Sequence, residues 1–334
     1  MLPAPFSRSL VLTGPTASGK TGLAIALAQR MNAEIIAMDS MTLYRGMNVG
    51  TAKPSAEERR LVAHHLIDVL EPWESWGPVT NRSPQETASV AWWLERAAEC
   101  CRDIESRGKQ VLFVGGTPLY LKALMFGLFD GPAADADLRH SLTEEARLLG
   151  AAALHGRLRE VDPVAAERIH ANDVRRVVRA LEVFQLTGRP ISSWQTEWDW
   201  RAGGVSPLSA TTTHSGGLRP PLAMVLDVPR IDLYERINRR VEEMFAAGLV
   251  EEVRALRETG RPFSMEASQA VGYKEVFTYL SGEANLQDTM ERVKMRTRQF
   301  AKRQMTWFRH LPGCQLATSE LTWKLWQFKM DVAE

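Results

Sequence analysis

Cysteine is scarce in this chain, and its placement excludes two classes of protein. Cys100, Cys101 and Cys314 are the three cysteines among 334 residues. They cannot form a disulfide framework, and none belongs to a Cys-x-x-Cys metal pair. Free thiols are typical of a reducing compartment, and the first residues contain no basic region followed by a long apolar core. We therefore expect a cytoplasmic protein.

Long apolar runs and an excess of charge are also missing. No run of about eighteen apolar residues occurs, so the sequence predicts no membrane span. The 41 Lys and Arg residues nearly balance the 40 Asp and Glu residues, so binding of a nucleic acid would require local clusters of basic residues. The hydrophobic content of 45% is sufficient for a sizeable globular core.

One segment carries a strong phosphate-binding signal. Residues 14–21 read Gly-Pro-Thr-Ala-Ser-Gly-Lys-Thr, a complete Walker A sequence between an apolar run at 9–13 and a helical pattern at 23–28. In such a loop the backbone N–H groups and the helix N-terminus bind a phosphate, while the lysine adds charge and the final hydroxyl can bind Mg²⁺. The motif leaves open whether the phosphates belong to a nucleotide or to another diphosphate ester.

Apolar runs that alternate with helical patterns predict a parallel sheet. The runs cover residues 9–13, 33–38, 64–69, 110–114 and 222–228. Strands that alternate with helices form a parallel sheet covered on both faces. With the Walker A segment after the first strand, this order predicts an α/β fold, a doubly wound parallel sheet similar to that of P-loop NTPases.

The sheet is interrupted by a helical insertion. Residues 135–186 carry only helical periodicity, and clusters of Gly, Ser, Thr and Pro that follow indicate a loop. The predicted parts are the first part of the core at 1–130, the helical insertion at 131–195, the loop at 196–221, the second part of the core with basic helices at 222–320 and a tail at 321–334.

Two positions could supply chemistry at the carboxyl edge of the sheet, where open α/β sheets bind ligands. Asp39 ends the second strand, where a carboxylate can act as a general base or bind Mg²⁺; a helix N-cap is the alternative. Arg236 and Arg240 share one helix face and could bind a diphosphate. They could equally form surface ion pairs with Asp232 and Glu243.

The end of the fourth strand weakens the case for an ATPase. It reads Gly115-Gly116-Thr117, so the acidic residue of a Walker B sequence is missing there. Glycines at this point allow close approach of the backbone, and Thr117 supplies a hydroxyl. An ordinary turn between a strand and a helix is as compatible with these residues.

Basic residues gather in two segments of this neutral chain. Arg175, Arg176 and Arg179 lie close together in the insertion. The helix predicted over about 287–308 and the residue after it carry Arg292, Lys294, Arg296, Arg298, Lys302, Arg303 and Arg309. Such a run alone is often just a solvated helix face. Two basic zones around one phosphate site nevertheless favour a polyanionic substrate, the arrangement that a nucleic acid requires.

A series of motifs runs in order through nearly the whole chain. After the Walker A segment come Asp39-Ser40, Tyr44-Arg45-Gly46-Met47, Gly50-Thr51-Ala52-Lys53-Pro54, His64-His65-Leu66-Ile67-Asp68, Val114-Gly115-Gly116-Thr117 with Leu119-Tyr120, Arg-Arg-x-x-Arg-Ala-Leu-Glu within 173–182, Val271-Gly272-Tyr273-Lys274-Glu275, and Thr297-Arg298-Gln299 through Trp307-Phe308-Arg309. This series resembles the tRNA dimethylallyltransferase family, also called tRNA isopentenyltransferases.

The resemblance implies a reaction and a set of site residues. The family transfers the dimethylallyl group of dimethylallyl diphosphate to N6 of the adenosine 3′ to the anticodon of tRNA, and diphosphate leaves. The residues implied for the diphosphate are Gly14, Thr16, Ala17, Ser18, Gly19, Lys20 and Thr21. Those implied for catalysis are Asp39 as the base at the adenine amine, Thr21 as the Mg²⁺ ligand, and Arg240, which would neutralise the leaving group. Contacts with tRNA are implied for Asp39, Ser40, Met41, Thr42, Thr117, Arg139, Arg175, Arg176, Val177, Val178, Arg179, Gln269, Ala270, Val271, Gly272, Tyr273 and Lys274.

The chain departs from the family pattern at two places. Thr42 stands where many members have Gln, and residues 76–84 differ from the Ser-led helix start of most members. The zinc module of eukaryotic members is absent, so we expect an enzyme of the bacterial type. We also expect a monomer. A small-molecule kinase using ATP and an RNA-binding NTPase are the competing interpretations of the Walker A segment. Transfer of a labelled dimethylallyl group to tRNA without ATP would distinguish them.

Overall fold

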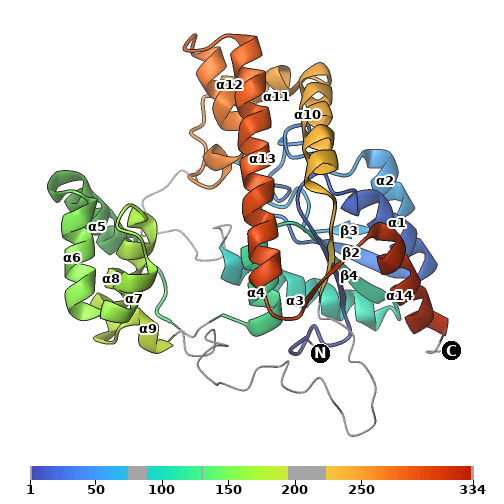
Figure 1. The fold of residues 1–334 in the computed structure, drawn as a ribbon, viewed down its shortest axis with the longest axis horizontal. Helices are drawn as coiled ribbons and strands as arrows, with labels where there is room; N and C mark the ends of the chain where they lie inside the picture. Colours follow the sequence, from blue (N-terminus) through green and yellow to red (C-terminus); the bar gives the residue numbers. More distant parts are fainter. Residues whose placement is uncertain (1, 74–88, 129–130, 195–222, 332–334) are drawn as a thin grey trace, which may run out of the picture. The chain divides into compact units, whose positions relative to one another are not determined.

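The computed structural model of this protein describes residues 2–73, 89–128, 131–194 and 223–331. The chain divides into two compact units, shown in Figure 1. The α/β unit comprises Met1–Met125 and Leu218–Glu334, and the helical unit comprises Phe126–Gly217. The domain limits predicted above stay a prediction, and the loop predicted at 196–221 lies outside the described residues, as does the departure at 76–84.

A six-stranded parallel sheet forms the centre of the α/β unit, with the order β3-β2-β4-β1-β5-β6. Its strands are β1 (Leu10–Thr13), β2 (Ala33–Ala37), β3 (His64–His65), β4 (Gln110–Gly115), β5 (Ala223–Leu226) and β6 (Cys314–Ala317). Thr13 pairs with Gly115, and Ala37 pairs with Val114. The carboxyl ends of β1, β2 and β4 therefore meet at one edge, and the predicted α/β class with a parallel sheet is confirmed.

The central strands are apolar on both faces, as parallel strands covered by helices must be. Leu12, Ile36 and Leu112 are fully buried. Helices before and after these strands are α1 (Lys20–Arg30), α2 (Ala56–Leu61), α3 (Val90–Ser106) and α4 (Pro118–Phe126). In α3, Trp93 is buried and its indole Nε1 donates to the carbonyl of Ala37, 3.1 Å away, so the packing also satisfies its polar atom.

Two parts of the sheet differ from the sequence prediction. The strand predicted over 64–69 is limited to two residues, because Leu66 and Asp68 both adopt φ of 58°, which leaves the extended conformation. Strand β6 and the helix α14 (Ser319–Asp331) that follows it were not predicted from the sequence. Strand β6 lies at the sheet edge with Gln315 and Leu316 exposed, so it lacks the long apolar run of a central strand.

Four α-helices lie between β5 and β6: α10 (Arg230–Ala246), α11 (Leu249–Glu258), α12 (Tyr273–Leu280) and α13 (Leu286–His310). The helix predicted over about 287–308 is thus confirmed, with ends shifted by a few residues. Helix α13 begins at the N-cap Asn285, whose side chain accepts from the Asp288 N–H at 2.8 Å. It packs against α10 through Leu233, Ile237 and Ala301.

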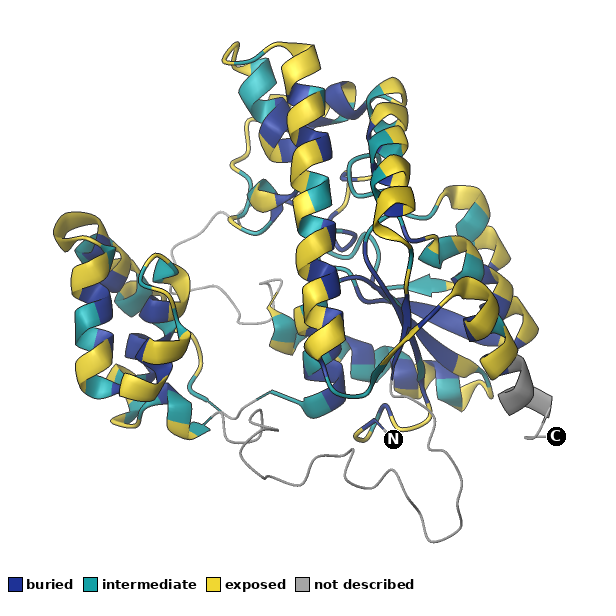
Figure 2. Ribbon diagram, viewed as in Figure 1, coloured by how far each residue is buried: buried dark blue, intermediate teal, exposed yellow. Residues whose placement is uncertain are grey.

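The helical unit contains α5 (Ala136–Leu149), α6 (Ala151–Val161), α7 (Pro163–Arg168), α8 (Val174–Thr187) and α9 (Ile191–Trp194). Asp135, Asp162 and Asp173 cap α5, α7 and α8, respectively, by accepting backbone N–H groups. These helices share one core of their own, to which Leu158 and Leu181 contribute. Figure 2 shows the buried residues of this unit in dark blue on the inner faces of its helices. The helical insertion predicted from periodicity therefore matches the described helices.

None of the helices in the described segments combines the length and the apolar character needed to cross a bilayer.

Candidate active site

The Walker A segment connects β1 to α1 and folds around its own lysine. Lys20 is the first residue of α1, and its Nζ donates to the carbonyls of Gly14 at 2.9 Å and Pro15 at 2.7 Å. Ala17 adopts φ of 62°, a conformation that costs free energy in a non-glycine residue and often occurs at ligand-binding loops. This bend leaves the N-terminus of α1 at the carboxyl edge of the sheet, where it can bind an anion.

Three of the predicted residues interact electrostatically at this edge. The pKa of Lys20 is lowered to about 7, mainly by withdrawal from water and also by the Arg240 guanidinium, while Asp39 opposes both effects. Withdrawal from water likewise lowers the pKa of Arg240, and Asp39 again opposes the shift. Two cations held close together in a partly dry site favour a ligand with several negative charges, because such a ligand would relieve both effects.

The contacts of Arg240 bear on its two proposed roles. Its Nη1 lies 3.5 Å from Oγ1 of Thr16 in the Walker A loop. Glu243, considered above as a surface partner, instead lies 3.6 Å from Arg239, and among the described residues Arg240 forms no ion pair. Arg236 is exposed beside the same loop: a Cβ built on Gly19 would lie 4.0 Å from its Nη1. The geometry therefore favours the phosphate-facing role for Arg240.

Asp39 is not a helix N-cap, because the first helix after β2 begins at Ala56. Its Oδ1 accepts from the backbone N–H of Met41 at 2.9 Å, which is a local turn around the end of the strand. The hydroxyl of Thr42 donates to the Asp39 carbonyl at 3.3 Å. These contacts fix the backbone of the loop and occupy one carboxylate oxygen.

The end of β4 holds this loop from the other side. A Cβ on Gly115 would lie 2.0 Å from the carbonyl oxygen of Met38, so only glycine allows the two strand ends to approach this closely. Thr117 Oγ1 accepts from the Ser40 N–H at 3.1 Å. The fold thus brings Ser40 and Thr117, both implied in tRNA binding, to the edge that carries Asp39.

The segment at 269–274 divides into exposed and buried residues. Gln269 and Lys274 are exposed, whereas the side chains of Ala270 and Tyr273 are buried and Val271 is intermediate. The Tyr273 hydroxyl donates to Glu252 at 2.5 Å. The same carboxylate accepts from the backbone of Asn48 and its neighbours. In this segment Gln269 and Lys274 are the side chains that a partner could contact directly.

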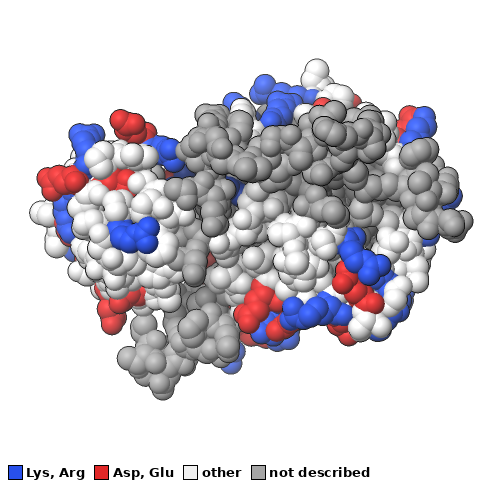
Figure 3. All heavy atoms as spheres, turned by 90° about the horizontal axis from the view of Figure 1, so that it is seen from below, with Lys and Arg blue, Asp and Glu red and all other residues white. Residues whose placement is uncertain are grey.

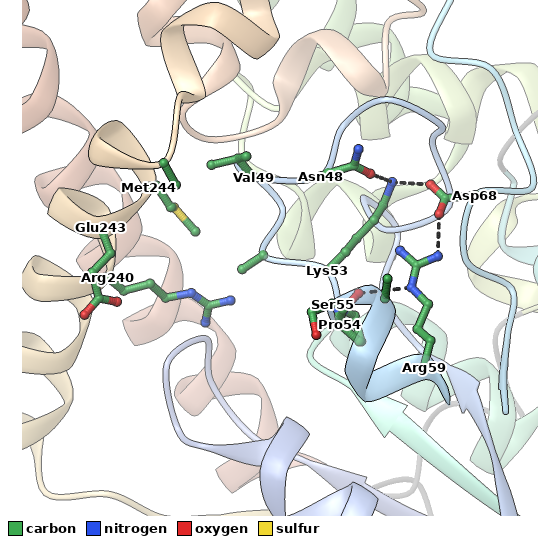
Figure 4. A pocket seen from close by; sticks show the side chains of 13 residues that line it. Asn48, Val49, Lys53, Pro54, Ser55, Arg59, Asp68, Arg240, Glu243 and Met244 are labelled. Atoms are coloured by element: carbon green, nitrogen blue, oxygen red, sulfur yellow. Dashed lines mark hydrogen bonds and ion pairs between the residues drawn. The ribbon is translucent and has the colours of Figure 1, made fainter. Parts of the chain in front are cut away.

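A cavity of about 820 Å³ opens beside Arg240. In Figure 4, Arg240 on α10 lies on the wall opposite Lys53 and Arg59. Asp68 bridges those two cations, at 2.6 Å from Lys53 and 2.7 Å from Arg59. Although burial opposes it, this double pairing lowers the pKa of Asp68. No role for Lys53, Arg59 or Asp68 was predicted from the sequence. Lys53 and Asp68 belong to the ordered motifs quoted above, which could have marked them.

Comparisons with known proteins agree with this geometry. The family model for IPP transferase matches residues 42–311, and that for isopentenyl transferase matches residues 8–67. The chain belongs to the IPP transferase family. A tRNA dimethylallyltransferase of Geobacter metallireducens is 43% identical over 327 residues, which cover 97% of this chain and 94% of that protein. One of Geobacter sulfurreducens is 44% identical, covering 92% of this chain and 90% of that protein.

Solved structures of IPP transferase relatives share the fold. The full-length tRNA isopentenylpyrophosphate transferase of Bacillus halodurans is 37% identical, with a TM-score of 0.63 over 98% of this chain and 96% of that one. A eukaryotic dimethylallyltransferase acting on tRNA is 26% identical, with a TM-score of 0.68 over 93% and 73% of the two chains. Membership of this family makes the chain a prenyltransferase, and a kinase is no longer the favoured alternative.

The tRNA-facing residues implied for the IPP transferase helical unit are held in different ways. Arg139 and Arg179 both contact the carboxylate of Glu182, at 2.9 Å and 2.6 Å, and Glu182 is completely buried. Arg176 is exposed, with Nε 3.3 Å from Asp173. Arg175 is also exposed. The side chains of Val177 and Val178 are buried in the core of the unit, so they support the helix that presents the arginines.

The basic helix α13 is less exposed than its sequence suggests. Lys294 is buried and contacts Glu242 at 2.6 Å and Glu291 at 2.9 Å, while Arg298 donates to Asn238 of α10 at 2.5 Å. The exposed basic residues are Arg292, Arg296, Lys302, Arg303 and Arg309. On the face drawn in Figure 3, basic and acidic side chains are interspersed. Lys294 therefore does not lie on a solvated face, and Arg298 is half-buried, because α10 packs against them.

Proposed function

We propose that this chain transfers the dimethylallyl group of dimethylallyl diphosphate to N6 of the adenosine 3′ to the anticodon in tRNA. The observation that carries this proposal is the meeting of Lys20, Arg240 and Asp39 at one edge of the sheet. Two desolvated cations are suited to a diphosphate, and the nearby carboxylate is suited to an amine nucleophile. Membership of the family and the tRNA dimethylallyltransferase activity of its relatives support the same reaction.

The donor diphosphate would lie against the N-terminus of α1. Negative charge develops on the leaving group as the allylic C–O bond breaks. This charge would be stabilised by the backbone N–H groups at the helix N-terminus and by the positive charges of Lys20 and Arg240. The adjacent cavity has a volume in the usual range for small-molecule sites, and Arg240 lines one wall of it. We infer that the donor is held with its diphosphate toward Arg240.

Thr21 would contribute a hydroxyl to a bound Mg²⁺. Mg²⁺ usually takes only one or two ligands from the protein and the rest from phosphates and water. The described residues contain no group of three or more His, Cys, Asp or Glu side chains placed to hold a metal, and Thr21 in the first turn of α1 fits a site of the phosphate-dependent kind. When bound, the ion would neutralise part of the charge on the leaving diphosphate.

Asp39 would orient the adenine amine and accept its proton. An exocyclic amine conjugated with the ring is a weak nucleophile, so alignment and proton removal assist its attack on the allylic carbon. Oδ1 of Asp39 is occupied by the Met41 N–H, which leaves Oδ2 for the amine. The N6–C bond forms, the C–O bond to diphosphate breaks, and the amine proton passes to Asp39.

The tRNA would be bound by both units. We infer that the helical unit contacts the anticodon stem-loop through Arg175 and Arg176, with Arg139 and Arg179 beside them. The exposed basic residues of α13 add a second phosphate-binding zone. We propose that the enzyme acts in the cytoplasm as a monomer.

The deciding experiment is incubation with unmodified tRNA, Mg²⁺ and labelled dimethylallyl diphosphate in the absence of ATP. Label should enter the tRNA and appear on a single adenosine after nuclease digestion. A parallel reaction with γ-labelled ATP tests the kinase alternative. Absence of label in tRNA, with consumption of ATP on a small-molecule acceptor, would refute the proposal.

A further inference from the structure

Gln304 connects two active-site loops that are far apart in the sequence. It lies on α13, and its side chain is buried with 2% exposed. Its Oε1 accepts from the backbone N–H of Thr16 at 2.9 Å, and its Nε2 donates to the carbonyl of Gly116 at 2.6 Å. Both polar groups of one buried amide are therefore used, each on a different loop.

Each of these loops serves one side of the reaction proposed above. Thr16 belongs to the Walker A loop, and its hydroxyl lies 3.5 Å from Arg240 on the diphosphate side. Gly116 precedes Thr117, which accepts from the backbone N–H of Ser40, the residue next to Asp39. A single side chain thus links the loop for the donor to the loop for the acceptor.

The surroundings show that the amide is matched to these two bonds. Ala301, Met305 and Phe308, which are buried on the same helix, are apolar, so an apolar residue would be the simplest choice at position 304. A Cβ on residue 116 would lie 2.6 Å from Gln304 Nε2 and 3.2 Å from the carbonyl of Gly14. Glycine at 116 therefore makes room for the amide.

We propose that Gln304 is a positioning residue that sets the distance between the diphosphate-binding loop and the loop that carries Asp39. This rests on the proposed prenyl transfer. In-line attack on an allylic carbon requires donor and amine to be held within a narrow range of separations, and a misplacement of about 1 Å can reduce a rate by about 10². Gln304 acts through the backbones of Thr16 and Gly116 and does not touch the substrates.

The test compares Gln304→Met with the wild-type enzyme under single-turnover conditions with saturating tRNA and donor. Met keeps the length of the side chain and loses both hydrogen bonds. The rate of prenyl transfer should fall by about 10- to 100-fold, while the affinity for tRNA changes by less than twofold. Gln287→Met, which changes an exposed glutamine on the first turn of the same helix, should leave the rate unchanged.

A double-mutant cycle separates positioning from simple stabilisation. Gly116→Ala should displace the Gln304 amide and slow transfer by a similar factor. The double variant should be little slower than either single variant, because both break the same link. Additive losses would overturn the proposal, as would a Gln304→Met enzyme that melts at a lower temperature but transfers at the normal rate when folded.

A further variant covers the case in which Gln304→Met does not fold. Gln304→Leu loses both hydrogen bonds and has a shorter side chain that fits the same apolar surroundings. We expect a loss of the single-turnover rate of about tenfold or more, and a normal rate would overturn the proposal. Failure of the wild-type enzyme to transfer any dimethylallyl group would instead refute the proposed function, so the two failures are distinguishable.

Discussion

Arg139 and Arg179 of the helical unit and Arg240 of the α/β unit are held in opposite ways. In the helical unit, Arg139 and Arg179 share the buried carboxylate of Glu182, and Arg179 also donates to the carbonyl of Pro132 at 2.9 Å. In the α/β unit, Arg240 forms no ion pair with another described residue; its recorded hydrogen bond is the 3.5 Å contact with Thr16. One carboxylate thus serves two arginines in the first case, and none serves Arg240 in the second.

The carboxylate fixes the position of Arg139 and Arg179, whereas Arg240 is available to bind a ligand. A guanidinium already bound to a carboxylate can present its outer N–H groups to tRNA, but part of its charge is neutralised. A guanidinium near Lys20 without a carboxylate at contact distance is destabilised until an anion arrives. The lowered pKa values of Lys20 and Arg240 record that cost.

Asp39→Asn should give the largest effect, because it removes the carboxylate that opposes both pKa shifts and accepts the proton. Asn keeps Oδ1 as an acceptor for the Met41 N–H, so the loop should persist. We expect the rate of transfer to fall by about 10² to 10⁴ with little change in tRNA affinity. Single-turnover assays at saturating tRNA and donor measure this loss, with Asp232→Asn, on the exposed first turn of α10, as control. Near-normal transfer would remove Asp39 from the catalytic residues.

Arg240→Ala and Lys20→Ala test whether these two cations serve the bound diphosphate. Each removes one charge opposite the leaving diphosphate, so each should reduce the transfer rate by about 10² to 10³. Filter binding should show tRNA affinity close to wild type. Arg239→Ala is the matched control, since Arg239 is the exposed neighbour that lies near Glu243. If Arg239→Ala and Arg240→Ala are equally mild, the two arginines do not differ as argued.

Glu182→Gln tests whether the buried carboxylate holds Arg139 and Arg179 in place. The amide keeps the shape of the side chain but leaves Arg139 and Arg179 without their carboxylate. Because Arg139 is 43% exposed, we expect the cost to be roughly 2 kcal/mol, below that of breaking a fully buried pair. Hydrogen exchange should become faster in α5 and α8. Glu144→Gln, at an exposed pair with Arg147, should leave exchange unchanged; equal protection in both variants would contradict the structural role of Glu182.

The sequence predicted the parts of this site that depend on local pattern. The Walker A segment, the strand before it and the helix after it were all recognisable, as was Asp39 at the end of a strand. The link through Gln304 could not be recognised, because Gln304 is 188 positions from Gly116 and 288 positions from Thr16 in the chain. The pairing of Lys294 and Arg298 with α10 was missed for the same reason. Helical periodicity identifies a face but does not show which neighbouring helix will cover it.

Arg176→Ala should have a moderate effect that depends on salt. Arg176 is exposed near Asp173, and loss of one phosphate contact should reduce the slope of log affinity against log salt by about one unit. Titration of tRNA at several salt concentrations measures the slope. Arg147→Ala, at the opposite end of α5 from Arg139, serves as control. An unchanged slope for Arg176→Ala, alone and combined with Arg179→Ala, would show that the helical unit does not grip tRNA phosphates.

The stability of the free enzyme should depend on pH through Lys20. Its pKa is lowered to about 7 in the folded protein, against 10.5 in the unfolded chain. Between these values the unfolded chain binds more protons, so the contribution of Lys20 to the free energy of unfolding rises with pH, by at most about 1.4 kcal/mol per unit.

Lys20→Met lacks this titration. The unfolding free energy of the wild type minus that of Lys20→Met should therefore increase from pH 7 to pH 9, as measured by urea unfolding at constant ionic strength without diphosphate. Lys302→Met, at an exposed position on α13, should show no such trend. A difference for Lys20→Met that is independent of pH would mean that Lys20 keeps an ordinary pKa, and the contrast between its site and the arginines around Glu182 would lose its electrostatic basis.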